Sequence, residues 1–277
     1  MKVSLGFSTC PNDTFMFDAL VNKRIDTKGI DFEVVMADIK ELNDMAFNSE
    51  LDITKLSYHA YVYLLKEYVL LDSGSALGHN CGPLLISKFP LKKSELDKNL
   101  SVAIPGEYTT ANLLFSLAYP SHKNKEVRLF SEIEDAVLKG ENDLGLIIHE
   151  NRFTYMEKGL HKVIDLGQFW ESSFNFPIPL GGIVAKRGLG IDKIKIINDL
   201  IQESVQFAFE NPEASKEFIL MHAQEMEAKV VSQHISLYVN NFSVQLGEQG
   251  RAAVKKLFEV GQEKRIFESS PYSIFMS

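Results

Sequence analysis

Short apolar runs alternate with segments that carry apolar residues at helical spacing through the first two thirds of the chain. Short apolar runs bounded by polar residues, Gly or Pro are typical of buried strands, and apolar residues three or four positions apart are typical of helices. The predicted strands are 3–7, 30–36, 52–56, 83–87, 100–104, 127–130, 143–148 and 181–185. From residue 192 onward the chain reads as helices alone. This order predicts an α/β protein with a helical C-terminal part.

The chain is long enough to form two lobes. It has 277 residues, and a single hydrophobic core stops growing at about 250–300 residues. The pattern that begins near residue 100 repeats the plan of the N-terminal part, and strands 83–87 and 181–185 are two candidate crossings between lobes. We therefore predict a larger discontinuous lobe, 1–88 and 185–277, a smaller lobe, 89–184, and a cleft between them.

Composition and charge exclude several classes of partner. The 29 Lys and Arg residues against 37 Asp and Glu residues give a net charge of −8 without a basic run, which argues against nucleic acid. Cys10 and Cys81 are far apart and form no CxxC pattern, which argues against a disulfide framework or a zinc site. No apolar stretch approaches the roughly 18 residues of a membrane span, and the N-terminus lacks the apolar region of a signal peptide. A cytoplasmic protein without a membrane partner is predicted.

Polar clusters follow four of the predicted strands, at residues 8–13, 55–57, 105–110 and 149–152. In open α/β sheets, ligands bind beyond the carboxyl ends of the strands, where helix N-termini offer free N–H groups. Two of these clusters belong to each predicted lobe, so a closed cleft would bring all four together.

Three hydroxyl residues in these clusters have two interpretations each. Ser57 lies between a strand and a helix, so it can serve as an N-cap, and the same free N–H groups favour a ligand carboxylate held by Lys55, Leu56 and Ser57. Thr109 and Thr110 stand at the start of the next predicted helix with the same alternatives. Capping and ligand contact are compatible.

His149 is the histidine with the best placement for chemistry, because an apolar strand delivers it to the ligand edge of its sheet. It is either a hydrogen-bonded residue at a strand end or a general base, since imidazole titrates near neutral pH. Glu150 orients it or faces water. Trp170 could stack on a flat ligand, although structural packing is the simpler role. The other histidines lack such placement: His59, His79, His122, His161, His222 and His234.

The motifs resemble a known family. Residues Gly6–Phe15 resemble the G-x-S-x-C-P-N-D-T-F start of 1,4-dihydroxy-6-naphthoate synthases. The resemblance covers most of the chain, and the other matching segments are 55–57, 106–111, 148–150, 152–154, 177–182, 237–240 and 246–247.

This resemblance implies a type II periplasmic-binding-protein fold and a lyase of menaquinone biosynthesis. The implied reaction converts cyclic de-hypoxanthine futalosine to 1,4-dihydroxy-6-naphthoate and dihydroxyacetone, without a metal or organic cofactor. The small-molecule substrate is a carboxylate, and a homodimer is compatible with the family. Carried onto this sequence, the family's base is His149 and its substrate contacts are Lys55, Leu56, Ser57, Thr109 and Thr110.

Two other functions remain open on the same fold. A chorismate dehydratase of the same pathway is one, and a non-enzymatic binding protein for small organic anions is the other. The CPNDTF start and the histidine after Ile148 favour the synthase. An exported binding protein would need a signal peptide or a lipobox. Fold alone decides none of these cases, because function depends on the site.

Overall fold

The computed structural model describes residues 2–96, 99–223 and 227–276 and divides the chain into two α/β units. The first unit comprises Met1–Gly78 and Pro179–Ser277, and the second comprises His79–Ile178. These boundaries differ from the predicted ones at 88 and 184. Strand β6 (Leu84–Ser87) pairs within the second unit's sheet, and β11 (Ile178–Lys186) pairs with strands of the first unit. Backbone pairing therefore assigns both crossing segments to the opposite unit from the one that the sequence suggested.

The first unit is built on a six-stranded sheet with the order β2-β1-β3-β11-β4, and β5 pairs with β11. Strand β1 runs parallel to β2 and β3, whereas β11 is antiparallel to β3 and β4. The carboxyl ends of β1 and β3 therefore lie side by side. The strands of this sheet other than β11 are β1 (Lys2–Phe7), β2 (Asp31–Met36), β3 (Ile53–Ser57), β4 (Tyr68–Leu70) and β5 (Ala76–Gly78).

Alternation along β1 decides which helices cover each face of this sheet. Leu5 and Phe7 are fully buried in a core shared with α1 (Pro11–Val21) and α8 (Ile191–Glu210). Gly6 faces the other way, where a Cβ atom would lie 2.9 Å from Leu42 of α2 (Ile39–Phe47). The missing side chain lets α2 pack close to the strand.

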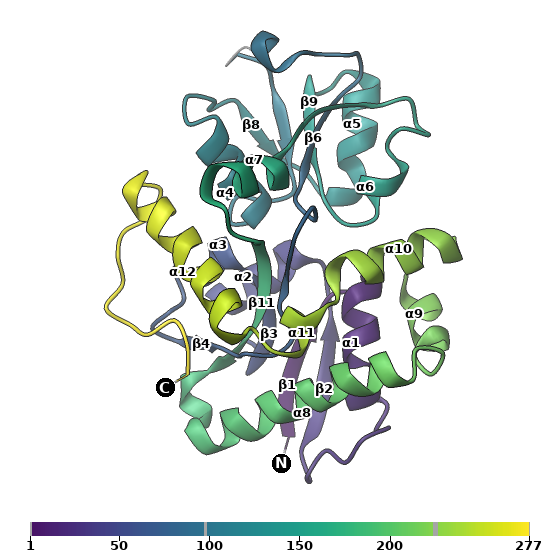
Figure 1. Ribbon diagram of the computed structural model, residues 1–277, viewed down its shortest axis with the longest axis vertical. Coiled ribbons are helices and arrows are strands. Elements are labelled where there is room, and N and C mark those ends of the chain that lie inside the picture. Colours follow the sequence, from purple (N-terminus) through teal and green to yellow (C-terminus); the bar gives the residue numbers. More distant parts are fainter. Residues whose placement is uncertain (1, 97–98, 224–226, 277) are drawn as a thin grey trace. The chain divides into compact units, whose positions relative to one another are not determined.

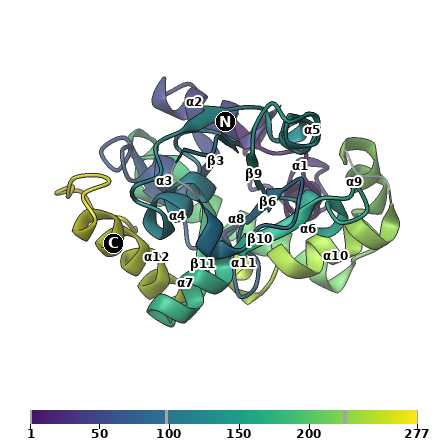
Figure 2. The same ribbon diagram turned by 90° about the horizontal axis from the view of Figure 1, so that it is seen from above.

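Helices α9 (Lys216–His222) and α10 (Ala228–Tyr238) lie beside α1, and both views show the three together (Figure 1, Figure 2). The last third of the described chain is helical, as predicted. The remaining helices of this unit are α3 (Tyr58–Tyr61), α11 (Asn241–Val244) and α12 (Gly247–Glu263).

The second unit repeats the plan of the first. Its sheet has the order β10-β6-β9-β7-β8, with β7 parallel to β8 and β9 and with β6 antiparallel to β9 and β10. In both sheets the first strand of the parallel set lies between the second and the third. The strands other than β6 are β7 (Val102–Ile104), β8 (Lys125–Val127), β9 (Leu144–Ile147) and β10 (His161–Asp165).

The predicted bounds of the strand at 127–130 were wrong. Strand β8 begins two residues earlier, because Lys125, Glu126 and Val127 pair with β7, and residues from Phe130 already form a 3₁₀ turn. Val127 and Leu129 are exposed, so their apolar character does not mark burial here.

Helices cover both faces of the second sheet (Figure 1). Ile133 and Val137 of α5 pack against β9 at Gly145, where a Cβ atom would lie 2.7 Å from Ile133 and 2.8 Å from Val137. Trp170 is fully buried in α7 and donates from Nε1 to the Pro177 carbonyl at 3.2 Å. It packs inside this unit, in agreement with the structural alternative for this residue. The helices are α4 (Thr110–Ala118), α5 (Ile133–Lys139), α6 (Asn151–Thr154) and α7 (Leu166–Phe174).

The cysteines form no disulfide among the described residues. Cys10 and Cys81 are both buried, and burial raises the pKa of the Cys81 thiol to about 12, so this thiol is held in its unreactive protonated form. In the described ranges, none of the helices combines the length and the apolar character that crossing a membrane would require.

Candidate functional site

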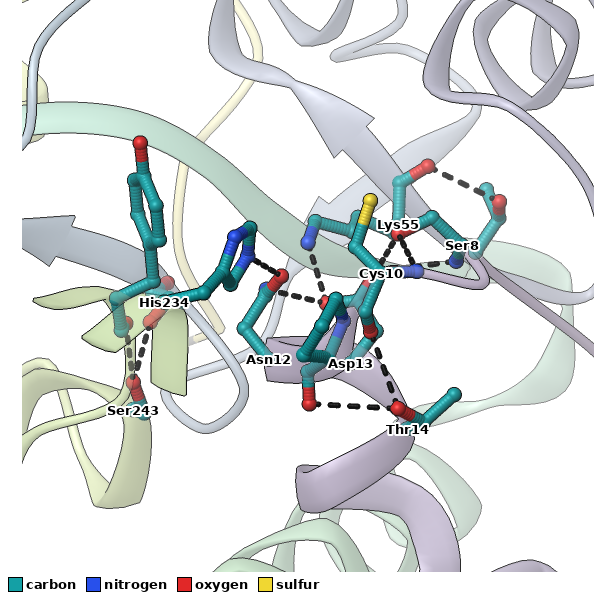
Figure 3. A network of polar contacts seen from close by, with 12 residues as sticks. Ser8, Cys10, Asn12, Asp13, Thr14, Lys55, His234 and Ser243 are labelled. Carbon is teal, nitrogen blue, oxygen red and sulfur yellow. Dashed lines mark hydrogen bonds and ion pairs between the residues drawn. The ribbon is translucent and has the colours of Figure 1, made fainter. Parts of the chain in front are cut away.

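Asp13 is the centre of a buried polar cluster in the first unit (Figure 3). Strand β1 ends at Phe7, and the chain turns so that the backbone N–H of Ser8 donates to Asp13 Oδ2 at 3.0 Å and the Ser8 hydroxyl donates to it at 2.6 Å. Asn12 Nδ2 donates to Asp13 Oδ1 at 2.8 Å, and the Lys55 ammonium group donates to the same oxygen. A carboxylate with no exposed surface is stable here because each oxygen accepts at least two hydrogen bonds.

Lys55 supplies a buried positive charge at the end of β3. Its side chain is 7% exposed and forms an ion pair with Asp13, whose side chain is 0% exposed. Strand β3 lies directly beside β1, which explains why residues 42 positions apart in sequence meet. An ammonium group has three N–H donors, and Asp13 is the acceptor of one. Lys55 can therefore donate to a ligand oxygen while it stays paired.

Ser57 ends the same strand and is held by Asn43 of α2. Its backbone N–H donates to Asn43 Oδ1 at 3.0 Å, and Asn43 Nδ2 donates to the Ser57 hydroxyl at 3.2 Å. Ser57 occupies the N-cap position of α3, but its side chain accepts no hydrogen bond from that helix. The capping role predicted for the hydroxyl is therefore wrong, and Ser57 Oγ is positioned by Asn43 instead.

Thr109 and Thr110 stand at the start of α4 in the second unit, and both are buried. Thr109 is the N-cap, as predicted: its hydroxyl accepts from the Asn112 N–H at 3.3 Å and donates to the Gly106 carbonyl at 2.8 Å. The hydroxyl's single proton is committed to Gly106, so Thr109 has no O–H left to donate to a ligand. The free N–H groups of the first helical turn are the stronger anion donors at this position.

Asn112, in the first turn of α4, and Lys125, in β8, stabilise this helix start. Asn112 Nδ2 donates to the Glu107 carbonyl at 2.7 Å, and Lys125 Nζ donates to Asn112 Oδ1 at 2.8 Å and to Ser116 Oγ at 2.7 Å. Burial, with the neighbouring Lys123 charge adding to it, lowers the pKa of Lys125 to about 8. The 105–110 loop is thus tied to β8 through a partly buried lysine.

This lowered pKa predicts a measurable dependence of stability on pH. A lysine has an ordinary pKa near 10.5, so between about pH 8 and 10.5 the unfolded state binds more protons at residue 125 than the folded state. The free energy of unfolding should then rise with pH, by at most about 1.4 kcal/mol per pH unit, relative to a Lys125→Met variant. Urea unfolding at pH 7, 8, 9 and 10 tests this. Lys162→Met, at an exposed lysine of the same unit, is the control, and equal pH profiles for wild type and Lys125→Met would contradict the prediction.

His149 follows β9 and has an unusual backbone conformation. Its φ angle is +57°, in the left-handed region, which costs a non-glycine residue on the order of 1–3 kcal/mol and persists only where the surroundings enforce it. The ring is partly buried and meets the Phe130 ring edge to face at a centroid distance of 5.0 Å. Glu150 is buried beside it.

Arg152 fixes the turn that carries His149. Its guanidinium group donates to the carbonyls of Gly82 and Asn80 and to Asp165 Oδ2 at 2.7 Å. Asp165 is buried and caps α7 by accepting from two backbone N–H groups. The short helix α6, which begins two residues after His149, is thereby attached to other parts of its own unit.

Neither unit, taken alone and over the residues that the structure describes, gathers three His, Cys, Asp or Glu ligand atoms within 4.8 Å of one another. The polar groups described above are carboxylate, ammonium, amide, hydroxyl and imidazole groups, which suit acid–base chemistry and the binding of an organic anion.

Comparison with known proteins assigns the chain to a family. The family model described as "Menaquinone biosynthesis" matches residues 3–263. The chain belongs to this menaquinone biosynthesis family. Two relatives are named 1,4-dihydroxy-6-naphthoate synthase. The one from Thermus thermophilus is 42% identical over 98% of this chain and 98% of the relative. The one from Streptomyces coelicolor is 44% identical over 92% of this chain and 91% of the relative. The family predicted from the CPNDTF start is confirmed.

Solved structures agree on the fold of this menaquinone biosynthesis family member. A crystal structure of a protein from Archaeoglobus fulgidus has a TM-score of 0.90 at 34% identity, covering 96% of this chain and 98% of that one. A Candida albicans protein with the generic periplasmic binding protein fold has a TM-score of 0.65 at 12% identity, covering 100% and 98%. The second likeness concerns the fold alone, and it confirms the predicted periplasmic-binding-protein-like class.

The structure places the predicted residues of this family member at the ends of strands, in two groups. Lys55, Leu56 and Ser57 lie at the end of β3 in the first unit. In the second unit, Thr109 and Thr110 follow β7, and His149 follows β9. Their roles in binding and catalysis remain predictions.

Four polar residues of the first unit were not selected individually from the sequence. Asp13 and Asn12 belong to the predicted polar cluster 8–13, and a carboxylate after β1 and a lysine at the end of a neighbouring parallel strand are expected to meet. Asn43 and His234 lie in helices α2 and α10, and no local pattern marks them. No sequence pattern placed His234 in a site, yet this residue is 0% exposed and its Nε2 lies 2.8 Å from Asn12 Oδ1.

Proposed function

We propose that the chain is a lyase that releases 1,4-dihydroxy-6-naphthoate and dihydroxyacetone from cyclic de-hypoxanthine futalosine in menaquinone biosynthesis. This proposal rests on the identity to the two naphthoate synthases, which is 42% over 98% of this chain for one and 44% over 92% for the other. We further propose that it acts in the cytoplasm on a small carboxylate substrate, with no nucleic acid or membrane partner. The family is compatible with a homodimer.

His149 is the proposed general base. Its position after β9, its partly buried ring and the anchoring of the following turn by Arg152 support a histidine held ready to accept a proton. Removal of the acidic C–H proton starts an elimination and retro-aldol sequence, and aromatisation of the new ring drives it forward. The role of Glu150, buried next to His149, is to orient the imidazole.

The proposed carboxylate contacts are the end of β3 and its polar neighbours. The Lys55 ammonium group supplies a charge-assisted hydrogen bond, and Ser57 Oγ is set in place by Asn43. In the second unit, the start of α4 at Thr109 and Thr110 stabilises negative charge that develops on a substrate oxygen. Because the Thr109 proton is donated to Gly106, the backbone N–H groups of α4 perform this role.

The test is an activity assay on the purified full chain. Cyclic de-hypoxanthine futalosine is incubated with the protein, with and without EDTA, and both products are followed by mass spectrometry. Equimolar naphthoate and dihydroxyacetone, formed at the same rate in both arms, are expected. No conversion by protein that is folded by circular dichroism would contradict the synthase. Chorismate is assayed in parallel, and its dehydration would assign the chain to the other reaction of the pathway.

A further inference from the structure

A line of buried hydrogen bonds connects α10 to the end of β3 within the first unit (Figure 3). His234 Nε2 and Asn12 Oδ1 are 2.8 Å apart, Asn12 Nδ2 donates to Asp13 Oδ1 at 2.8 Å, and that oxygen also accepts from Lys55. All four residues are at most 6% exposed. The contacts join residues from three elements that are up to 222 positions apart.

The chemistry of the groups determines which atom donates and which accepts in each of these hydrogen bonds. An ionised Asp13, paired with Lys55, can only accept hydrogen bonds. Asn12 must therefore turn its NH₂ group toward Asp13, which leaves its carbonyl oxygen toward His234. An amide oxygen accepts, so Nε2 of His234 must carry a hydrogen. Asp13 thus sets the orientation of the Asn12 amide, and the buried imidazole holds the other end of that amide in place.

The orientation of Asn12 in turn affects Lys55. Asp13 Oδ1 is shared between the Asn12 amide and the Lys55 ammonium group, so the amide helps to set where this oxygen lies. Without the His234 donor, the Asn12 amide is held at its NH₂ end alone, so the position of the Asn12 group that donates to Asp13 Oδ1 is less well fixed. The ammonium group then has a less well-defined acceptor in a site where an error of about 1 Å weakens a charge-assisted hydrogen bond.

We propose that His234 is a positioning residue that orients the Lys55 ammonium group toward the carboxylate of the ligand, through Asn12 and Asp13. The inference rests on the proposed function, because it takes the naphthoate carboxylate as the group that Lys55 holds. It assigns to α10, in the C-terminal helical part, a role in ligand recognition. A purely structural role is the alternative, since the His234 ring also packs 4.7 Å from the Tyr238 ring.

The test compares two ligands that differ only in the carboxylate. Affinities for 1,4-dihydroxy-6-naphthoate and for 1,4-dihydroxynaphthalene are measured by fluorescence titration under anaerobic conditions. His234→Leu keeps an apolar side chain in the core but removes the donor. It is expected to weaken naphthoate binding about tenfold, a typical effect of losing one well-placed hydrogen bond to a charged group, and to change binding of the diol by less than about twofold.

Two further variants distinguish the loss of the hydrogen-bond donor at residue 234 from the loss of core packing. Gln places an amide N–H near the position of Nε2, so His234→Gln is expected to retain naphthoate affinity within about threefold, whereas His234→Asn, whose amide is shorter, is expected to behave like His234→Leu. This pair decides the matter if His234→Leu fails to fold. His222→Leu is the matched control, because His222 contacts the Phe218 ring of α9 and has no part in this line of contacts.

A double-mutant comparison tests whether the effect passes through Lys55. In an Asp13→Asn, Lys55→Met background, adding His234→Leu should leave naphthoate affinity unchanged. Equal weakening of both ligands, or an effect of full size in that background, would overturn the positioning role. Wild-type protein that neither binds naphthoate nor produces it would instead contradict the proposed function, so the two failures are distinguishable.

Discussion

Replacing His149 with alanine is expected to lower kcat for cyclic de-hypoxanthine futalosine by a factor of 10² to 10⁴ while the affinity for 1,4-dihydroxy-6-naphthoate stays within about threefold of wild type. The factor is the contribution usually measured for a positioned general base. Product binding is expected to survive because the imidazole is proposed to move a proton, and the proposed carboxylate contacts are Lys55 and Ser57. Steady-state kinetics and equilibrium titration of the product measure the two quantities.

The control for this variant is His161→Ala. His161 is an exposed histidine at the start of β10 in the same unit, and its replacement should leave kcat within about twofold. A His149→Ala enzyme that retains more than about a tenth of wild-type turnover would show that His149 is not the base. Restoration of turnover by added imidazole would support the role directly, because it replaces the missing base without altering the chain.

Replacing Asp13 with asparagine is expected to lower the free energy of unfolding by about 3–5 kcal/mol, the usual cost of leaving a buried charge without its partner. The Lys55 side chain is 7% exposed, so water cannot replace the lost counter-charge. Urea unfolding at pH 7, followed by circular dichroism and fluorescence, measures the change.

The same substitution in an exposed ion pair provides the comparison. Asp44 pairs with Lys40 across one turn of α2, and both side chains are more than a third exposed. Asp44→Asn should therefore cost at most about 0.5 kcal/mol. The double variant Asp13→Asn, Lys55→Met should recover most of the lost stability, because removing both charges of a buried pair is often neutral. Equal losses in the free energy of unfolding for Asp13→Asn and Asp44→Asn would mean that burial does not determine the contribution of the Asp13–Lys55 ion pair.

The two groups of strand-end residues differ in how they are held. In the first unit, Asp13, Lys55 and Ser57 are fixed by side chains from other elements, so their geometry depends on the packing of α2 and α10. In the second unit, Thr109 is fixed by its own helix start, and His149 by a turn that Arg152 attaches to nearby carbonyl groups. Substitutions in α10 are therefore expected to affect ligand binding, and substitutions around Arg152 to affect turnover.

The sequence predicted most of the strands and the ends at which function is expected. Short apolar runs are local signals, and a polar residue after such a run marks a strand end without any knowledge of the fold. This is why His149, Lys55, Thr109 and Thr110 could be selected in advance. The N-cap role of Thr109 was also local, because a cap bonds within three residues of itself.

The positions of the unit boundaries could not be obtained in the same way. Strands β6 and β11 are apolar runs of similar character, and nothing within either run tells which sheet it joins. That choice depends on hydrogen bonds to β9 and β10 for β6 and to β3 and β4 for β11. Apolar character was also misleading at Val127, the last residue of β8, and at Leu129 beyond it, because both side chains are exposed.

The sequence by itself determined the family, the α/β class and the strand ends where the proposed chemistry lies. This was possible because motifs and hydrophobic patterns depend only on residues that are close together in the sequence. Only the tertiary structure decided which side chains hold those strand ends in place. Asn43 contacts Ser57 from 14 positions away, and His234 contacts Asn12 from 222 positions away. A buried polar group must find its partner wherever packing brings one within about 3 Å.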